Sequence, residues 1–202
     1  MITLHCTTRS TFSRRVRIAL LEKEMEHTLA LVDMAAGAHK SPDYLALNPY
    51  GRVPTIEHDG FVLYESTAIL GYLEGVQPDG RLFPKDPRDR ALAELHMKLC
   101  DVEFTRYAGV ILFSKRFQPR ESWDQQAFAE ARRPIERHLA IVATELNGNE
   151  FLVANRFSAA DVVYMPHLHF LPLLEVEVPP EVQAWADRLL SRPSATATVP
   201  EA

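Results

Sequence analysis

Two stretches of the chain, together spanning about twenty residues, carry groups suited to holding a small peptide with charged ends. The first stretch is Asn48-Pro49-Tyr50-Gly51, a turn sequence, followed by Arg52-Val53-Pro54. An X-Pro bond can be cis at low cost, and a cis bond at Pro54 would turn the Val53 backbone away from a sheet and towards a ligand. The second stretch, Glu65-Ser66, places an acid and a hydroxyl at a helix start, where free N–H groups can hold a carboxylate. Taken alone, Ser66 is more often only a helix cap.

The elements that must position these groups form a β-α-β-α-β-β-α pattern. Alternation predicts strands at 2–6 and 27–33, with a helix between them that ends near 23 and a loop or irregular helix at 35–44. The β-α-β order implies that these two strands run parallel. His58-Asp59-Gly60 predicts a hairpin, and the apolar spacing after it predicts a helix over 65–74.

Three prolines and a glycine between 77 and 87 indicate a linker, and everything beyond it has helical spacing. We therefore expect an α/β domain at 1–77, a linker at 78–87 and an all-helical domain at 88–202. Long helices are predicted from 88 to 116, with a bend near Gly109, and from 123 to 146, with Pro134 inside. Ser158 and Asp161 have the spacing of a capping box that starts a buried helix. A last helix is expected at 180–191, and the tail at 194–202 is expected to be frayed.

Composition excludes several classes of protein. The net charge of -5 argues against general nucleic-acid binding, and no apolar run is long enough to span a membrane. The N-terminus lacks the apolar core of a signal peptide, so a cytoplasmic location is expected. Cys6 and Cys100 are far apart and are expected to be reduced and buried. His167 and His169, two residues apart on a helix, point in different directions and do not make a zinc set, so no metal is expected.

With this layout in place, the chain resembles the cytosolic glutathione transferases over nearly its full length, most closely the serine-type phi and theta-like classes. Five segments carry the resemblance: 10–16 as the active-site serine loop, 39–42, 48–54 and Glu65-Ser66 as the glutathione site, and 158–161 as the capping box. The resemblance implies an α/β thioredoxin-like N-terminal domain plus an all-α C-terminal domain. It also implies an enzyme that activates the glutathione thiol for attack on a small hydrophobic electrophile or a peroxide.

The resemblance also implies roles for individual residues. Ser10 would donate a hydrogen bond to the glutathione sulfur, with Thr11 as the fallback donor. The glutathione backbone and its charged ends would meet His39, Lys40, Arg52, Val53, Pro54, Glu65 and Ser66. Basic side chains would take the glycyl carboxylate, the Val53 backbone would take the cysteinyl unit, and Glu65-Ser66 would take the γ-glutamyl end. The electrophile would lie between Phe12 and the long helix, near Phe104, Tyr107, Ala108 and Ile111.

Departures from the family pattern narrow the expectation. No cysteine stands at 10–13, which argues against cysteine-type members, and Phe12 replaces the cysteine of the zeta-class pattern. Thr67 stands where the family usually has an arginine that supports the subunit interface, so the expected homodimer would lack that contact. A second hypothesis is a non-catalytic protein of the stringent starvation protein A type that binds RNA polymerase, because 12–13, 16–18 and 22–23 also resemble that family.

Overall fold

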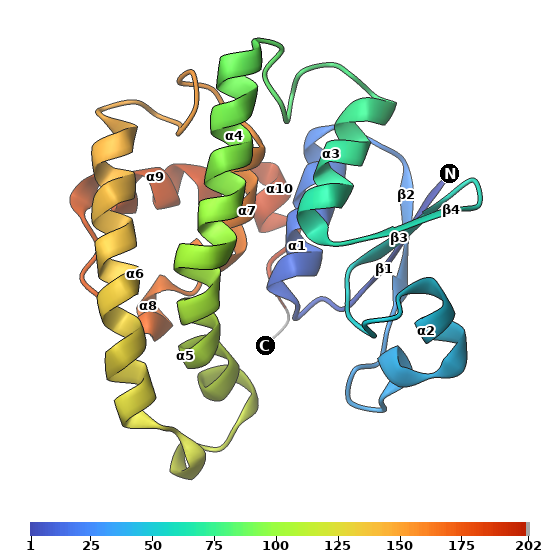
Figure 1. The fold of residues 1–202 in the computed structure, drawn as a ribbon, viewed down its shortest axis with the longest axis horizontal. Coiled ribbons are helices and arrows are strands. Elements are labelled where there is room, and N and C mark those ends of the chain that lie inside the picture. Colours follow the sequence, from blue (N-terminus) through green and yellow to red (C-terminus); the bar gives the residue numbers. More distant parts are fainter. Residues whose placement is uncertain (201–202) are drawn as a thin grey trace. The chain divides into compact units, whose positions relative to one another are not determined.

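The computed structural model describes residues 1–200, which form two compact units. One unit contains Met1–Phe83 together with the C-terminal segment that begins at Pro193, and the other contains Pro84–Arg192. The first unit holds a sheet with helices, and the second is helical (Figure 1). The predicted fold class is therefore confirmed. The C-terminal segment belongs to the sheet-containing unit, whereas the predicted division assigned it to the helical domain.

The described part of the first unit contains one four-stranded sheet in the order β2-β1-β3-β4. Its elements are β1 (Ile2–Cys6), α1 (Thr11–Glu22), β2 (His27–Leu31), a 3-10 turn (Ala38–Lys40), α2 (Pro42–Leu47), β3 (Thr55–His58), β4 (Phe61–Tyr64), α3 (Ser66–Val76) and α10 (Pro193–Thr196). Strand β1 pairs parallel with β2 and antiparallel with β3, as predicted for the first two strands. The β3-β4 hairpin turns at Asp59 and Gly60, both with positive φ, because a two-residue turn of this hand matches the twist of the strands.

The side chains of strand β1 point alternately to the two faces of the sheet. Ile2, Leu4 and Cys6 are buried, and α1 and α3 pack together on one side of the sheet (Figure 1). His5 faces the other way, where its ring meets the edge of Tyr44 from α2 at 6.1 Å between centroids. Helix α2 thus covers the face that carries His5, and its tyrosine enters the core of the unit.

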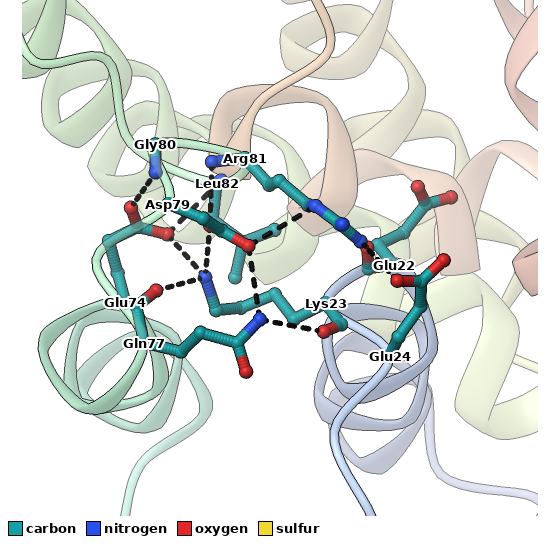
Figure 2. A network of polar contacts seen from close by, with 9 residues as sticks. All are labelled: Glu22, Lys23, Glu24, Glu74, Gln77, Asp79, Gly80, Arg81 and Leu82. Carbon is teal, nitrogen blue, oxygen red and sulfur yellow. Dashed lines mark hydrogen bonds and ion pairs between the residues drawn. The ribbon is translucent and has the colours of Figure 1, made fainter.

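A polar network fixes the C-terminal end of α1 to the end of α3 and the segment that follows (Figure 2). Lys23 is fully buried, and its Nζ donates to Glu74 Oε2 at 2.8 Å, to the Gln77 carbonyl at 2.7 Å and to Asp79 Oδ1 at 2.6 Å. Glu74 also accepts from the Gly80 N–H at 2.7 Å. Burial alone would raise the pKa of Asp79, but the hydrogen bonds from Lys23 and the Arg81 N–H outweigh it and hold the pKa at about 2. The network therefore holds the C-terminal ends of α1 and α3 together.

The C-terminal segment corrects the expectation of a frayed tail at 194–202. Ser194, Ala195 and Thr198 are buried, and α10 packs on α1. Arg14 on α1, itself buried, donates to the Ala195 carbonyl at 3.1 Å and to Thr198 Oγ1 at 3.3 Å. The guanidinium therefore ties the segment to α1 over a sequence separation of more than 180 residues. The last two positions of the expected tail, 201 and 202, lie outside the described residues.

The second unit is helical, and its first long helix bends at a different place from the predicted one. Its elements are α4 (Pro87–Leu99), a π-helical segment (Cys100–Thr105), α5 (Arg106–Phe117), a 3-10 turn (Arg120–Ser122), α6 (Gln125–Leu146), α7 (Ala159–Leu168), α8 (Leu171–Leu174) and α9 (Pro180–Leu190). The predicted bend near Gly109 is wrong, because Gly109 lies within regular α5 and the wide turns at 100–105 interrupt the helix instead. Pro134 is accommodated inside α6.

Helix α7 lies in the core of the helical unit, and all of its residues are buried. The predicted capping box is confirmed: the Asp161 carboxylate accepts from the Ser158 N–H at 2.9 Å. The same carboxylate accepts from the Leu152 N–H at 3.3 Å and from Trp185 Nε1 at 3.0 Å, so it joins α7 to α9. Burial raises the pKa of Asp161 to about 6 against the effect of these donors.

Candidate functional site

The two stretches singled out in the sequence line one pocket in the first unit. The pocket has a volume of about 70 Å³ and is lined by Phe12, Asn48, Arg52, Val53, Pro54, Glu65 and Ser66. All of these except Asn48 are residues that the sequence predicts for the site. The turn before β3 and the start of α3 therefore face the same small hollow, together with the first turn of α1.

Val53 and Pro54 present backbone to this pocket. The Val53–Pro54 peptide bond is cis, and Pro54 is buried directly before β3 begins at Thr55. Val53 lies outside the strand ladder, and its N–H and C=O make no hydrogen bond within the part of the chain that the structure describes. Both groups are therefore available to pair with an extended peptide.

The N-terminus of α3 supplies polar groups to the opposite wall. Glu65 is an exposed residue with φ 72 and ψ 114, a conformation that is strained for a residue with a side chain and that occurs most often at functional sites. Ser66 opens the helix and is buried, and its Oγ accepts from Nη1 of the buried Arg15 at 3.4 Å. An acid, a hydroxyl and the free N–H groups of a helix start meet here, as the sequence predicts.

Ser10 is the N-cap of α1, and Thr11 is the first residue of that helix. The Ser10 Oγ accepts from the Ser13 N–H at 3.1 Å, which leaves its own O–H able to donate to another group. Phe12 follows in the first turn with 39% of its surface exposed, and the Arg15 guanidinium lies 4.8 Å from the centroid of its ring. The cap and the positive end of the helix dipole thus coincide at the residue predicted to activate a thiol.

The basic residues predicted for the site lie in two adjoining segments. Lys40 in the 3-10 turn donates from Nζ to the Tyr50 carbonyl at 3.3 Å. A Cβ at Gly51 would lie 2.7 Å from the His39 carbonyl oxygen and 2.8 Å from Lys40 Nζ, so only glycine permits this approach. The close approach places His39 and Lys40 beside Gly51, the residue before the exposed Arg52. Arg52 lines the pocket, whereas His39 and Lys40 do not.

Two side chains that the sequence did not mark as functional support the pocket. Asn48 was predicted as part of the turn and of the segment 48–54, with no role for its own side chain, yet its Nδ2 donates to the Arg52 carbonyl at 2.9 Å. Tyr44 appeared only at the end of an irregular segment, yet its hydroxyl donates to the same carbonyl at 2.7 Å. Nothing in the local sequence indicates these contacts, because they depend on how α2 packs beside the segment before β3.

The residues predicted to meet the electrophile on the long helix all belong to the helical unit. Phe104, Ala108 and Ile111 are buried, and Tyr107 is partly exposed with the Arg106 guanidinium 5.6 Å from its ring. The Phe104 ring stacks on His138 at 5.9 Å, and His138 Nε2 pairs with the Tyr164 hydroxyl at 2.8 Å. Burial, assisted by the charge of His96, lowers the pKa of His138 to about 4. A role for these residues towards a substrate stays a prediction.

Neither a metal cluster nor a membrane-spanning helix is found in residues 1–200. No three His, Cys, Asp or Glu side chains of this range are grouped so that they could hold a metal ion. His167 is buried in α7, where its ring meets the edge of Phe104. Among the helices that the structure describes, none combines the length and apolar character needed to cross a membrane.

The fold and the pocket define a thioredoxin-like sheet domain with a proline-bordered pocket, accompanied by a helical unit. Two family models match the chain: the glutathione S-transferase N-terminal domain over residues 9–76 and the glutathione S-transferase C-terminal domain over residues 105–193. The chain belongs to the glutathione S-transferase family and is a transferase.

Individual relatives agree with this assignment over nearly the whole chain. A glutathione S-transferase of Silene vulgaris is 33% identical, with 96% of this chain and 94% of the relative covered. The glutathione S-transferase APIC of Nicotiana tabacum is 30% identical with the same coverage. Among solved structures, glutathione transferase F7 from Populus trichocarpa is 27% identical and superimposes with a TM-score of 0.91 over 98% of this chain and 97% of the other. These comparisons give no support to the stringent starvation protein A hypothesis.

Proposed function

We propose that the pocket binds glutathione and that Ser10 activates its thiol for attack on a small hydrophobic electrophile or a peroxide. The observation that carries the proposal is the pocket lining, because six residues predicted for the site from two separate stretches and the first turn of α1 lie around one hollow. A glutathione transferase homolog from Sulfitobacter, solved with bound glutathione, is 25% identical and superimposes with a TM-score of 0.82 over 98% of this chain and 96% of the other. This likeness supports the same ligand here.

The γ-glutamyl end of glutathione carries an ammonium and a carboxylate, and the start of α3 offers a partner for each. The Glu65 carboxylate would pair with the ammonium, and the Ser66 hydroxyl with the free N–H groups of α3 would hold the carboxylate. The strained backbone of Glu65 supports this role, since such strain clusters at ligand-binding sites and Glu65 is an exposed acid at the N-cap of α3.

The remaining peptide would lie along the segment before β3. The Val53 N–H and C=O would pair with the cysteinyl unit, and the buried Pro54 would form the wall below it. Arg52, together with His39 and Lys40 beside the preceding Gly51, would attract the glycyl carboxylate. Charge and strand-like pairing would thus fix both ends of a tripeptide and leave its sulfur free to meet α1.

At α1 the thiol would meet the Ser10 hydroxyl, which already caps the helix through its lone pair and can donate its hydrogen. A free thiol has a pKa near 8.5, so only a few per cent is ionised at pH 7. Each unit by which the pKa falls corresponds to about 1.4 kcal/mol of thiolate stabilisation. The helix dipole acts in the same direction, and Thr11 is the alternative donor.

The second substrate, the assembly state and the location complete the proposal. We expect the electrophile to meet Phe12, the exposed aromatic residue of the pocket lining. We expect a homodimer in the cytoplasm, without the arginine contact that Thr67 replaces. Light scattering coupled to gel filtration measures the assembly state, and a monomer at micromolar concentration would contradict the dimer.

Calorimetric titration with glutathione tests the site. The wild type should bind, and Glu65→Gln should weaken binding about tenfold or more, because it removes the charge that pairs with the ammonium. Glu26→Gln is the matched control, since Glu26 is an exposed acid of the same unit that does not line the pocket. Absence of binding by the wild type, or equal weakening in both variants, would contradict the proposed site.

A further inference from the structure

Two buried side chains donate hydrogen bonds to one backbone carbonyl, that of Arg52, which lines the pocket. The Tyr44 hydroxyl donates to the Arg52 carbonyl at 2.7 Å, and Asn48 Nδ2 donates to the same oxygen at 2.9 Å. Tyr44 and Asn48 are only 7% and 2% exposed. Since a carbonyl oxygen has two lone pairs, these donors satisfy it completely from the protein side.

A third residue closes these contacts into a ring. Asn48 Nδ2 has a second hydrogen, which it donates to Thr55 Oγ1 at 3.2 Å. The Thr55 hydroxyl hydrogen is then free for the Tyr44 oxygen, 3.2 Å away. Asn48 Oδ1 accepts from the Tyr50 N–H at 3.1 Å, which fixes the orientation of the amide. The ring binds the chain at Arg52 and at Thr55, so only Val53 and Pro54 lie between its two attachment points.

The ring sets the direction of the Val53 N–H. The Arg52 carbonyl and the Val53 N–H belong to one planar peptide group, and this bond is trans, because the only cis bond found in residues 1–200 is Val53–Pro54. In a trans peptide the C=O and N–H point in opposite directions. The carbonyl points at the buried Tyr44 and Asn48, so the N–H of Val53 points away from them. Arg52 and Val53 both line the pocket.

The donors of the ring keep their hydrogens near neutral pH. Burial raises the pKa of Tyr44 above its ordinary value, with a smaller opposing effect of the Thr55 hydrogen bond. An amide side chain does not titrate. The two hydrogen bonds to the Arg52 carbonyl therefore persist over the pH range in which a glutathione thiol ionises.

We propose that Tyr44 and Asn48 are positioning residues for glutathione, which hold the Arg52–Val53 peptide group so that the Val53 N–H faces the cysteinyl unit. This inference rests on the proposed function of the pocket. It assigns to α2 a part in substrate affinity without contact to the reacting sulfur. Because Ser10 lies on a different element, the positioning acts on binding and leaves thiol activation alone.

Tyr44→Phe tests the role, since it keeps the ring and removes only the donor. With one of two bonds to the carbonyl lost, the Kd and the KM for glutathione should both rise about fivefold. The kcat at saturating glutathione, and the pH at which the rate is half maximal, should equal those of the wild type. Unchanged Kd and KM, or a fall in kcat with KM unchanged, would overturn the proposal.

Two control variants separate positioning from general loosening. Thr55→Val removes the buried hydroxyl that closes the ring, so it should lower Tm at least as much as Tyr44→Phe does, but both donors to the Arg52 carbonyl remain. Its KM for glutathione should stay within about twofold of wild type. Tyr50→Phe removes an exposed hydroxyl from the neighbouring turn and should change neither quantity. If Thr55→Val raises KM as much as Tyr44→Phe, the effect is loss of stability and the positioning role is wrong.

A parallel titration of Glu65→Gln distinguishes failure of this inference from failure of the proposed site. If Glu65→Gln weakens glutathione binding and Tyr44→Phe does not, the site stands and the positioning role falls. If Tyr44→Phe weakens binding while Glu65→Gln leaves it unchanged, the peptide group is held as inferred and the assignment of the γ-glutamyl end is wrong.

Discussion

Replacement of Ser10 should separate two roles that its hydroxyl combines. As the N-cap of α1 it accepts from the Ser13 N–H at 3.1 Å, and as the proposed activator it donates to the glutathione sulfur. Ser10→Ala removes both. Loss of the cap costs about 1 kcal/mol, which lowers Tm by about 2–4 °C for a chain of this size. Loss of a hydrogen bond to a charged group costs about 1.5–3 kcal/mol, so the thiol pKa should rise by roughly one to two units.

The rate near neutral pH should therefore fall between about tenfold and a hundredfold in Ser10→Ala. The assay is conjugation of glutathione with a chlorodinitrobenzene at saturating glutathione, with peroxide reduction as a second assay. Ser10→Gly is the matched control, because glycine at an N-cap costs only a few tenths of a kcal/mol relative to serine. It should lose as much activity as Ser10→Ala and less stability.

Two results would refute this reasoning. An unchanged rate in Ser10→Ala would remove Ser10 from the mechanism and direct attention to Thr11, whose replacement by valine would then abolish the rate. A rate in Ser10→Gly close to that of the wild type would show that capping of α1, and not hydrogen bonding to sulfur, explains any loss in Ser10→Ala.

Three further predictions concern stability. Lys23→Met leaves the carboxylates of Glu74 and Asp79 without their buried partner, so the free energy of unfolding in urea should fall by about 3–5 kcal/mol. His138 is neutral in the folded helical unit with a pKa of about 4 but protonates near 6.5 when unfolded, so protonation favours the unfolded state as the pH falls. About 3 kcal/mol of stability present above pH 6.5 should therefore be lost as the pH falls to 4. In His138→Gln this loss should be absent when the free energy of unfolding in urea is measured across the same pH range. Thr198→Val removes a buried hydroxyl that accepts from Arg14, so thermal unfolding should show a loss of about 1 kcal/mol.

Each of these has a control or a contradicting result. Lys85→Met removes an exposed lysine of the same charge and should leave stability unchanged, whereas equal loss in both variants would contradict the buried network. If the stability of His138→Gln depends on pH in the same way as that of the wild type, folding does not lower the pKa of His138, which contradicts the prediction. An unchanged Tm in Thr198→Val would fit a frayed tail and contradict the contact with α1.

The parts of the site that the sequence predicts are those with strong local chemistry. A proline after valine restricts the backbone wherever it occurs, and an acid with a serine before an apolar helical spacing marks a helix start. Val53-Pro54 and Glu65-Ser66 could therefore be placed without knowledge of their surroundings. The hairpin at Asp59-Gly60 followed for the same reason, because its turn needs two residues with positive φ.

The parts that could not be predicted depend on packing between distant segments. The ring formed by Tyr44, Asn48 and Thr55 requires α2 to lie against the segment before β3, and no periodicity encodes that contact. The sequence around Lys23 is typical of a solvated helix end, yet the Lys23 side chain is buried because the ends of α1 and α3 meet.

Helix geometry and the C-terminal segment were predicted poorly for related reasons. A glycine weakens a helix only slightly, so Gly109 is a poor marker of a bend, and the π-helical turns at 100–105 leave the apolar spacing almost unchanged. The segment from Pro193 has a low-complexity composition, but its order comes from Arg14, a residue at the other end of the chain.

The central claim is that the glutathione thiol is bound in the pocket and ionised by Ser10, and a direct titration of the bound thiol measures it. The ultraviolet absorbance of the thiolate, followed against pH in the complex with glutathione, gives the pKa of the bound sulfur. The account predicts a pKa at least about one unit below the free value near 8.5, and a return towards that value in Ser10→Ala while glutathione remains bound. The same pKa in the wild type and in Ser10→Ala would contradict it.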